Sequence, residues 1–194
     1  MEENNIKAPC KVLLIGGSAG SLQVIFSLLP IIKPDFTFAV VIVLHRRNSA
    51  DSALPELLST KTLAPTLEAE DKDPILPGKF YLAPADYHLL IEKNGTFSLD
   101  YSEKINFSRP SIDVTFECAA EIYGPSLVAM LLSGANEDGT KGLLAVKKMG
   151  GTTVVQNPDT AQMPFMPQHA ISNHAANHIL NIRELAEFIN NLSD

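Results

Sequence analysis

The sequence has few cysteines, few basic residues and no tryptophan. Its two cysteines, Cys10 and Cys118, lie far apart without the spacing of a metal site, which excludes a disulfide framework and predicts reduced, structural thiols. The 15 Lys and Arg residues against 22 Asp and Glu residues give a net charge of -7. Because phosphate neutralisation needs a surplus of basic residues, we expect no nucleic-acid binding, although this balance leaves room for a local basic patch.

Long hydrophobic runs are absent as well. Residues 38–44 form the longest one, about a third of what a membrane-spanning helix needs. The first ten residues have no apolar segment behind a basic start, so they do not look like a secretory signal. These absences predict a cytoplasmic protein that does not insert into a membrane.

Size and composition fit a folded domain. The chain has 194 residues, of which 45% are hydrophobic and 19% are charged, an ordinary balance for a globular protein with a substantial core. No repeat, linker-like stretch or low-complexity segment interrupts it. The sequence therefore predicts a single domain over residues 1–194, with residues 1–9 poorly ordered.

Short apolar segments alternate with segments of helical periodicity, which is typical of a parallel sheet covered by helices. In the middle of the chain, Asn94-Gly95 separates two strand-like segments and is a strong hairpin-turn signal. The pattern predicts an α/β fold with a doubly wound, mainly parallel sheet, helices on both faces and an antiparallel hairpin excursion. We expect strands at residues 11–15, 36–44, 79–83, 87–92, 96–101, 126–132 and 152–156, and helices at residues 22–29, 54–58, 112–122, 142–149 and 183–192.

Three polar residues follow expected strands directly or within a short loop. Ser18 follows the first strand, His45 follows the second, and Asp138 lies in the loop after the strand at residues 126–132. In open α/β sheets, ligands bind beyond the carboxyl ends of the strands. We therefore expect the three side chains to lie at one edge of the sheet.

These residue types suit nucleophilic catalysis. A serine hydroxyl is a weak nucleophile until an imidazole removes its proton, and a carboxylate must orient that imidazole and stabilise its charge. Ser18 is also expected near the start of a helix, where unpaired backbone N–H groups stabilise an oxyanion. The sequence therefore favours a serine hydrolase with Ser18 as nucleophile, His45 as base and Asp138 as the orienting acid.

Other interpretations of the same residues stay open. Residues 16–20 match the G-x-S-x-G elbow, but an ordinary α/β-hydrolase has more strands before its serine and a different order of triad residues. A nucleotide-binding turn is disfavoured because Ser18 breaks the G-x-G-x-x-G spacing and no G-K-[ST] follows. His45 alone also fits a structural histidine, and Asp138 alone fits a helix N-cap.

Metal binding is not expected from this sequence. His174 and His178 are four residues apart, but no further ligand cluster and no H-E-x-x-H pattern accompanies them. We therefore predict neither a metal site nor a cofactor.

Several motifs together resemble one known family, the catalytic domain of CheB-type protein-glutamate methylesterases. The resemblance runs from about Lys11 to about Ile171, and the order and spacing of its segments are more specific than any one of them. The segments are Ile15-Gly16-Gly17-Ser18-Ala19-Gly20, Val43-Leu44-His45, Leu76-Pro77-Gly78, Tyr81-Leu82-Ala83-Pro84, His88-Leu89, Arg109-Pro110-Ser111-Ile112-Asp113, Leu132-Ser133-Gly134-Ala135-Asn136-Glu137-Asp138-Gly139, Gln156-Asn157-Pro158 and Met166-Pro167.

The resemblance implies hydrolysis of glutamyl methyl esters on the cytoplasmic helices of a chemoreceptor, and in some members glutamine deamidation. Ser18 would attack the ester carbonyl, and His45 and Asp138 would complete the triad. Backbone N–H groups near Ala19 and Ala135 would bind the oxyanion. The family commonly has a serine, a threonine and two glycines in the nucleophile turn and a methionine where Ala135 stands, so the substrate-facing wall is expected to differ. His88 and Arg109 are further candidates to line the substrate groove.

Typical members also carry an N-terminal receiver domain that blocks the active site until it is phosphorylated. About ten residues precede the first expected strand here, so we expect no receiver domain in this chain and regulation, if any, by a regulator or methyltransferase in trans. The expected partner is a methylated chemoreceptor cytoplasmic domain. The alternative hypothesis is a non-catalytic binding module of the same fold that acts in a signalling complex.

Overall fold

The computed structural model describes residues 8–46 and 53–193. Residues 1–7 lie outside this description, and with them most of the segment expected to be poorly ordered. Within the described residues, seven strands form one sheet and two more form a separate antiparallel pair. The strands are β1 (Val12–Gly17), β2 (Ala39–Leu44), β3 (Thr66–Glu68), β4 (Phe80–Leu82), β5 (His88–Ile91), β6 (Phe97–Asp100), β7 (Leu127–Leu131), β8 (Thr152–Gln156) and β9 (His178–Leu180).

The large sheet has the strand order β3-β4-β2-β1-β7-β8-β9, and each pairing in it is parallel. The chain adds β2 on one side of β1 and β7 on the other, so the strand order reverses at β1. A crevice for ligands is expected at such a reversal, beyond the carboxyl ends of the strands. β5 and β6 form the antiparallel excursion, and the turn between them contains Gly95 at φ 78°.

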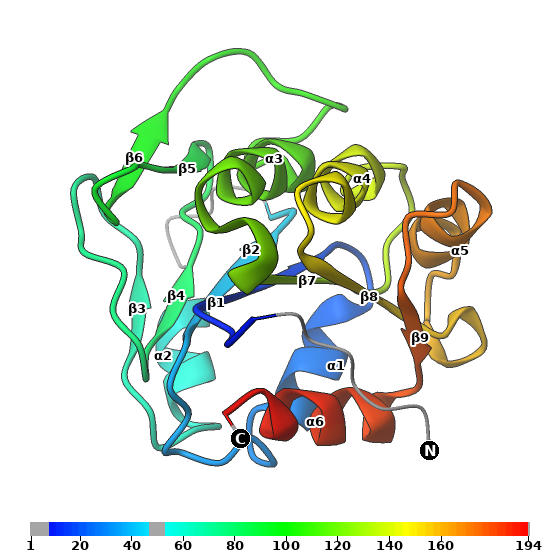
Figure 1. Cartoon of the computed structure of the whole chain (residues 1–194), viewed down its shortest axis with the longest axis horizontal. Helices are drawn as coiled ribbons and strands as arrows, with labels where there is room; N and C mark the ends of the chain where they lie inside the picture. Colours follow the sequence, from blue (N-terminus) through cyan, green and yellow to red (C-terminus); the bar gives the residue numbers. More distant parts are fainter. Residues whose placement is uncertain (1–7, 47–52, 194) are drawn as a thin grey trace.

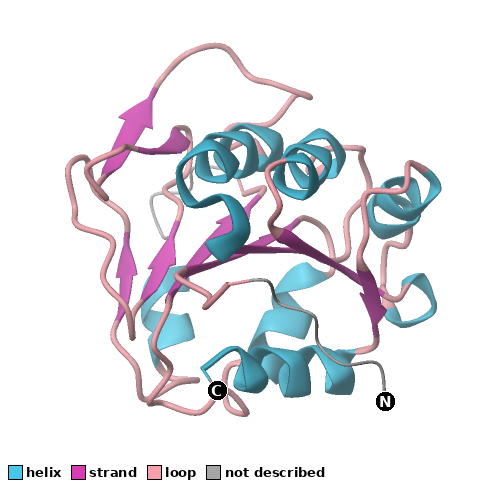
Figure 2. Ribbon diagram, in the orientation of Figure 1, coloured by secondary structure: helices cyan, strands magenta, loops and turns pink. Residues whose placement is uncertain are grey.

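Helices cover both faces of the sheet, as Figures 1 and 2 show. Residues of α1, α2 and α6 share one hydrophobic core with one face of the sheet. Residues of α3, α4, α5 and the β5–β6 hairpin share the core on the opposite face. The helices are α1 (Ser21–Leu28), α2 (Leu54–Ser59), α3 (Ile112–Tyr123), α4 (Thr140–Lys148), α5 (Phe165–Ser172) and α6 (Ile182–Asn190).

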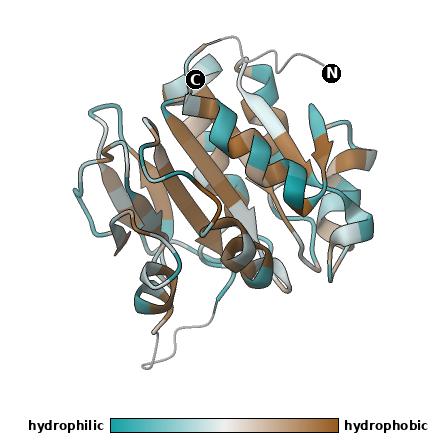
Figure 3. Ribbon diagram, turned by 90° about the horizontal axis from the view of Figure 1, so that it is seen from below, coloured by the Kyte–Doolittle hydropathy of each residue, from teal (hydrophilic) through white to brown (hydrophobic). Residues whose placement is uncertain are grey.

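The central strands are apolar along their length because both of their faces are covered. In β1, Leu13 and Ile15 point into the core beside α1 and α6, whereas Val12 and Leu14 point into the core beside α3. All four side chains are at most 1% exposed. Figure 3 shows these strands as a hydrophobic centre inside a more polar exterior. A strand buried on both faces has no polar alternation, which is why the sequence pattern identified it.

The predicted fold class is confirmed, and most of the expected elements are present with shifted ends. Three elements were missed: the edge strands β3 and β9 and the helix α5. Both strands have only three residues, too few for a periodic signal. α5 contains Pro167 and follows Pro164, and prolines indicate turns in a sequence although they fit the first turn of a helix.

α3 and α4 pack closely at Gly142. A Cβ atom placed on Gly142 would lie 2.5 Å from Cβ of Phe116, and the backbone N–H of Gly142 donates to Asp113 Oδ1 at 2.7 Å. We expect Gly142→Ala to lower the free energy of unfolding by about 1–3 kcal/mol, because a helix-favouring methyl group here overpacks the interface. Urea unfolding would measure this, with the exposed Lys141→Ala as control. An unchanged or higher stability would contradict the packing argument.

No helix among residues 8–46 and 53–193 combines the length and the apolar character needed to cross a bilayer.

Candidate active site

Ser18 and His45 lie side by side because the ends of β1 and β2 are in register. Gly17 pairs with Leu44, so Ser18 and His45 are the next residues on two neighbouring parallel strands. The backbone N–H of His45 donates to the carbonyl of Gly17 at 3.2 Å. On the other side of β1, the N–H of Ser18 donates to the carbonyl of Ser133 at 2.9 Å. The turn that carries Ser18 is therefore fixed between the loop after β2 and the loop after β7.

The turn that carries Ser18 is tight. The carbonyl of Ser18 accepts the Ser21 hydroxyl at 2.6 Å and the Ser21 N–H at 3.1 Å, and Gly20 has φ 82°. A Cβ atom on Gly17 would lie 2.4 Å from Cβ of Ser21, so this position requires glycine. α1 begins at Ser21, three residues after Ser18 and one residue before the expected start at residue 22. The half-buried Ser18 side chain remains accessible at the sheet edge.

His45 is held by a carboxylate through its Nε2 atom. Nε2 lies 2.7 Å from Asp138 Oδ2, and the other ring nitrogen, Nδ1, lies 3.5 Å from the amide nitrogen of Asn136. When Nε2 carries the proton and donates a hydrogen bond to Asp138, Nδ1 has the acceptor lone pair, which the amide of Asn136 approaches at 3.5 Å. The nitrogen available to accept a serine proton is therefore Nδ1, whereas serine proteases of the chymotrypsin type use Nε2. Both arrangements leave one ring nitrogen for the acid and one for the nucleophile.

Asp138 is completely buried, and its carboxylate contacts the first residues of α3. Its Oδ2 accepts the N–H of Ile112 at 2.7 Å, and its Oδ1 accepts the N–H of Asp113 and the Ser111 hydroxyl, each at 3.0 Å. Burial by itself would raise the pKa of Asp138. The hydrogen bonds from His45 and from the α3 backbone outweigh burial and hold this pKa below its usual value. Asp138 is therefore an ionised acceptor for the imidazole.

The sequence suggested that Asp138, if not catalytic, would cap the helix that follows it. The N-cap of α4 is Gly139, which has no side chain to accept a hydrogen bond. Asp138 instead accepts hydrogen bonds from the first N–H groups of α3. This helix lies earlier in the chain, so local sequence does not reveal the contact. The N-terminal dipole of α3 and its unpaired N–H groups favour the negative charge next to His45.

A second buried carboxylate, Asp113, lies beside Asp138. Asp113 is 4% exposed and accepts the N–H of Gly142 at Oδ1. The amide nitrogen of Asn106 donates to Asp113 Oδ2 at 3.3 Å and to Asp138 Oδ1 at 3.4 Å. Burial and the nearby charge of Asp138 raise the pKa of Asp113 to about 6. Asp138 therefore stays ionised, whereas Asp113 keeps its proton to a higher pH.

This arrangement makes stability depend on pH. Between about pH 4 and pH 6, the folded protein holds the Asp113 proton and the unfolded chain does not, so the stability that Asp113 contributes falls as pH rises through this window. We expect wild type, compared with Asp113→Asn, to lose on the order of 3 kcal/mol of unfolding free energy between pH 4 and pH 7. Urea unfolding at several pH values measures the difference. Parallel pH profiles for the two proteins would contradict it, and the exposed Asp159→Asn serves as control.

The candidate oxyanion donors lie on loops that Ser133 joins. The Ser133 hydroxyl donates to the carbonyl of Ala19 at 2.7 Å and accepts the N–H of Met163 at 2.9 Å. Within the described part of the chain, the backbone N–H groups of Ala19 and Ala135 have no hydrogen-bond partner. Both residues are exposed. Ala19 directly follows Ser18, and Ala135 lies in the loop after β7, which contacts Ser18 through Ser133. Two free donors near the candidate nucleophile would suit a developing oxyanion, and this role stays a prediction.

A pocket of about 590 Å³ opens beside the imidazole. Arg109 lies on its wall and also holds the loop before α3: its Nη1 donates to the carbonyls of Tyr101 and Ser102, and its guanidinium stacks on the Tyr101 ring at 3.8 Å. Arg109 therefore lies on the wall of this pocket, and its role in a substrate groove stays a prediction. The residues lining the pocket are His45, Arg46, Asp86, Lys104, Phe107, Ser108 and Arg109.

His88 does not line the groove, contrary to expectation. Its side chain is 0% exposed, Nε2 lies 2.9 Å from the carbonyl of Glu103, and Nδ1 accepts the N–H of Ser111 at 3.1 Å. Both ring nitrogens are thus used to connect β5 to the segment before α3. His88 is a structural residue behind the site. Its position in a strand next to polar residues did not distinguish this role from a role in the groove.

Three residues that support Asp138 were not singled out as site residues from the sequence: Asn106, Ser111 and Asp113. A signal was present for one of them, because Ser111 directly precedes an apolar helical segment, as N-cap residues do. Nothing in the sequence connected Asn106 with Asp138, 32 residues away.

His174 and His178 do not share a helix face, since His178 belongs to β9 and His174 precedes it at φ 57°. No group of three or more His, Cys, Asp or Glu side chains among the described residues has the arrangement of a metal site.

Residues 13–189 match the family model described as CheB methylesterase. A relative from Leptospira interrogans is 41% identical over 177 residues, which cover 91% of this chain and 92% of the relative. The protein-glutamate methylesterase/protein-glutamine glutaminase of Thermotoga maritima is 35% identical over 180 residues, and the protein of the same name from Halobacterium salinarum is 36% identical over 181 residues. The chain spans about half the length of these last two relatives.

A solved structure is also similar. The crystal structure of the Thermotoga maritima CheB methylesterase catalytic domain superposes with a TM-score of 0.90 at 34% sequence identity. The match covers 95% of this chain and 100% of that domain.

Proposed function

Because this chain belongs to the CheB methylesterase family, we propose that it hydrolyses glutamyl methyl esters on the cytoplasmic helices of a chemoreceptor through Ser18, His45 and Asp138. The chain is a protein-glutamate methylesterase; the chemoreceptor as substrate and the roles of the three residues are the proposal. One observation carries the proposal. Nε2 of the His45 imidazole lies 2.7 Å from the buried Asp138 carboxylate, and His45 and Ser18 follow paired residues at the ends of two adjacent strands.

The first half-reaction forms an acyl-enzyme. Ser18 Oγ attacks the γ-carbonyl carbon of the glutamyl ester while Nδ1 of His45 takes the hydroxyl proton. Asp138 stabilises the imidazolium, and its low pKa keeps it ionised throughout. The N–H groups of Ala19 and Ala135 stabilise the negative oxygen of the tetrahedral intermediate. The imidazolium then gives its proton to the leaving methoxide, which departs as methanol.

The second half-reaction hydrolyses the acyl-enzyme and restores the free Ser18 hydroxyl. A water molecule gives a proton to Nδ1 of His45 and attacks the acyl carbon, and Ser18 leaves with the proton returned from the imidazolium. The product is a glutamate carboxylate on the substrate protein. Deamidation of a glutamine follows the same steps with ammonia as leaving group, and we include it in the proposal because relatives carry the glutaminase name as well.

The test is methanol release from a methylated chemoreceptor cytoplasmic fragment, with mass spectrometry of the fragment to locate the demethylated glutamates. We expect wild type to release methanol in proportion to the glutamates formed. An unmethylated fragment provides the blank. Folded protein that releases no methanol from the methylated fragment would refute the proposed substrate.

A further inference from the structure

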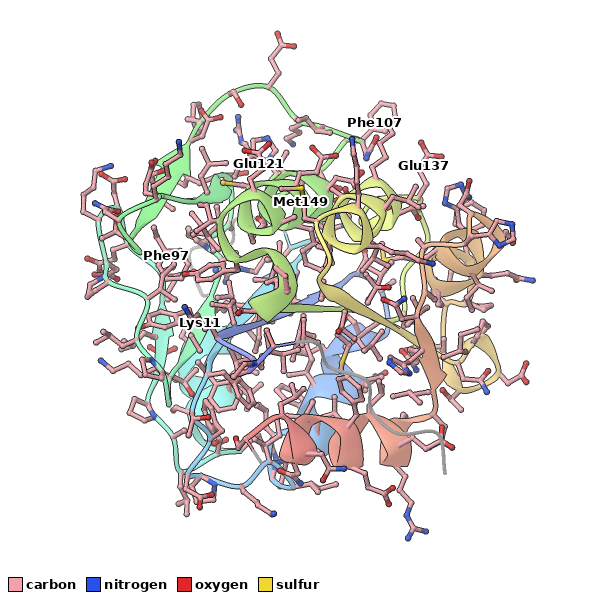
Figure 4. All side chains as sticks on the ribbon, in the orientation of Figure 1. Lys11, Phe97, Phe107, Glu121, Glu137 and Met149 are labelled. Carbon is pink, nitrogen blue, oxygen red and sulfur yellow. The ribbon has the colours of Figure 1, made fainter. Side chains whose placement is uncertain are left out.

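The loop before α3 presents a phenylalanine to solvent at the mouth of the active-site pocket. Phe107 is 99% exposed and lines the pocket together with His45. Figure 1 shows this loop arching over the helices from β6 to α3, and Figure 4 shows the Phe107 ring directed away from the body of the protein. A fully exposed aromatic ring gains nothing from burial in the free protein, but single exposed apolar side chains are common, so the significance of this ring depends on where it lies and on the backbone that holds it.

The backbone at this point is strained. The N–H and carbonyl groups of Ile105 and Ser108 form two hydrogen bonds, of 3.2 Å and 2.9 Å, and close a two-residue turn. Asn106 and Phe107 occupy its centre at φ 51° and φ 62°. Asparagine tolerates the left-handed region, but phenylalanine does so only at a cost, because its Cβ crowds the backbone. Glycine would fit this position better, as in most turns of this kind.

The turn is fixed to the catalytic machinery. The side-chain amide of Asn106 donates to Asp113 and to Asp138, the acid that orients His45. Arg109, two residues beyond Phe107, ties the loop to the carbonyls of Tyr101 and Ser102. The position of the exposed ring is therefore set relative to the imidazole. Strain that the surroundings maintain at such a place is typical of functional contacts.

The charge at the pocket mouth differs from that of the whole chain. The chain has a net charge of -7, yet Lys104 and Arg109 line the pocket, and Asp86 is the acidic residue there. Lys104 is exposed and makes no ion pair within the described residues. A partner that carries an acidic side chain and an apolar side chain close to the reacting ester would complement this mouth.

We infer that Phe107 and Lys104 form the docking contact for the protein substrate and select an ester-bearing helix on which an apolar and an acidic side chain flank the methylated glutamate. The inference rests on the proposed function and specifies its substrate class. On docking, the Phe107 ring packs against the apolar side chain of that helix, and Lys104 pairs with the acidic one. An exposed aromatic anchor beside a charge is the usual composition of a contact that dominates binding.

The experiment compares a protein substrate with a small one. We define the selectivity ratio as kcat/KM for a methylated chemoreceptor cytoplasmic fragment divided by kcat/KM for p-nitrophenyl acetate, a small ester without the flanking side chains of a helix. We expect Phe107→Ala and Phe107→Gly each to lower this ratio at least about tenfold, mainly through KM for the fragment. Phe107→Gly should also raise Tm, because it removes the left-handed phenylalanine. Lys104→Glu should lower the ratio, with a smaller effect at high salt.

The control is Phe165→Ala, which removes another exposed aromatic ring that lies outside the pocket lining, and its ratio should equal that of wild type. An unchanged ratio in both Phe107 variants overturns the docking role. An equal loss of ratio in Phe165→Ala also overturns it, because the effect is then not specific to this turn. Wild type that hydrolyses p-nitrophenyl acetate but not the fragment overturns the proposed substrate and the docking inference with it, while the esterase remains; wild type that hydrolyses neither overturns the proposed function as a whole.

Discussion

Replacing Ser18 by alanine is expected to lower kcat for methanol release by at least about 10⁴-fold, because the acyl-enzyme can no longer form. His45 and Asp138 contact each other without Ser18, so their geometry should survive the substitution. The backbone of Ser18, which bonds to Ser133 and Ser21, is also unaffected. The variant should therefore fold with nearly the stability of wild type. The residual activity would measure what the oxyanion donors and substrate binding contribute alone.

A fluorophosphonate probe supplies a second readout. Wild type should gain one covalent adduct, which peptide mapping places on Ser18, and Ser18→Ala should gain none. The matched control is Ser27→Ala, an exposed serine on α1 whose hydroxyl bonds only to the carbonyl of Gln23 within the described residues. Methanol release by Ser18→Ala at more than about a hundredth of the wild-type rate would show that another group is the nucleophile, and the triad proposal would fail.

The sequence predicts the central strands and their carboxyl ends well because these features are local. β1, β2 and β7 are continuous apolar runs, and such runs are buried on both faces wherever they occur. Once the strands are placed, the edge rule brings Ser18 and His45 together without further information. The number of residues between the two strands does not matter, because the parallel register of β1 and β2 places the residues that follow them side by side.

Features that depend on contacts between distant segments were beyond the sequence. His88 looked like a groove residue, yet the buried position of β5 against α3 turns its ring inward to Ser111. The alternative role of Asp138 was a cap for the next helix, yet it accepts the first N–H groups of α3, which begins 26 residues earlier. Asn106 lies in a loop with no periodicity, so its amide contact with both carboxylates had no signal. In each case the tertiary packing selects one of several partners that local chemistry permits.

The proposed role of Asp138 as the triad acid allows a prediction that separates catalysis from structure. Asp138→Asn is expected to lower kcat by about 10⁴-fold, because a neutral amide neither stabilises the imidazolium nor fixes its tautomer. It should also lower the free energy of unfolding by about 1–3 kcal/mol. Oδ2 accepts the N–H of Ile112 and Oδ1 accepts that of Asp113, so the amide nitrogen of an asparagine faces a backbone donor in either orientation.

Kinetics at a temperature where the variant is folded, together with urea unfolding, measure the two effects separately. The control is Asp159→Asn, which changes an exposed carboxylate outside the lining of the pocket beside the imidazole and should alter neither quantity. Ser111→Ala removes one donor to Asp138 Oδ1 but leaves its charge and its contact with His45, so it should reduce stability more than kcat. If Asp138→Asn lost stability while kcat stayed within about tenfold of wild type, the carboxylate would be a helix cap alone, and His45 would have to act without an acid partner.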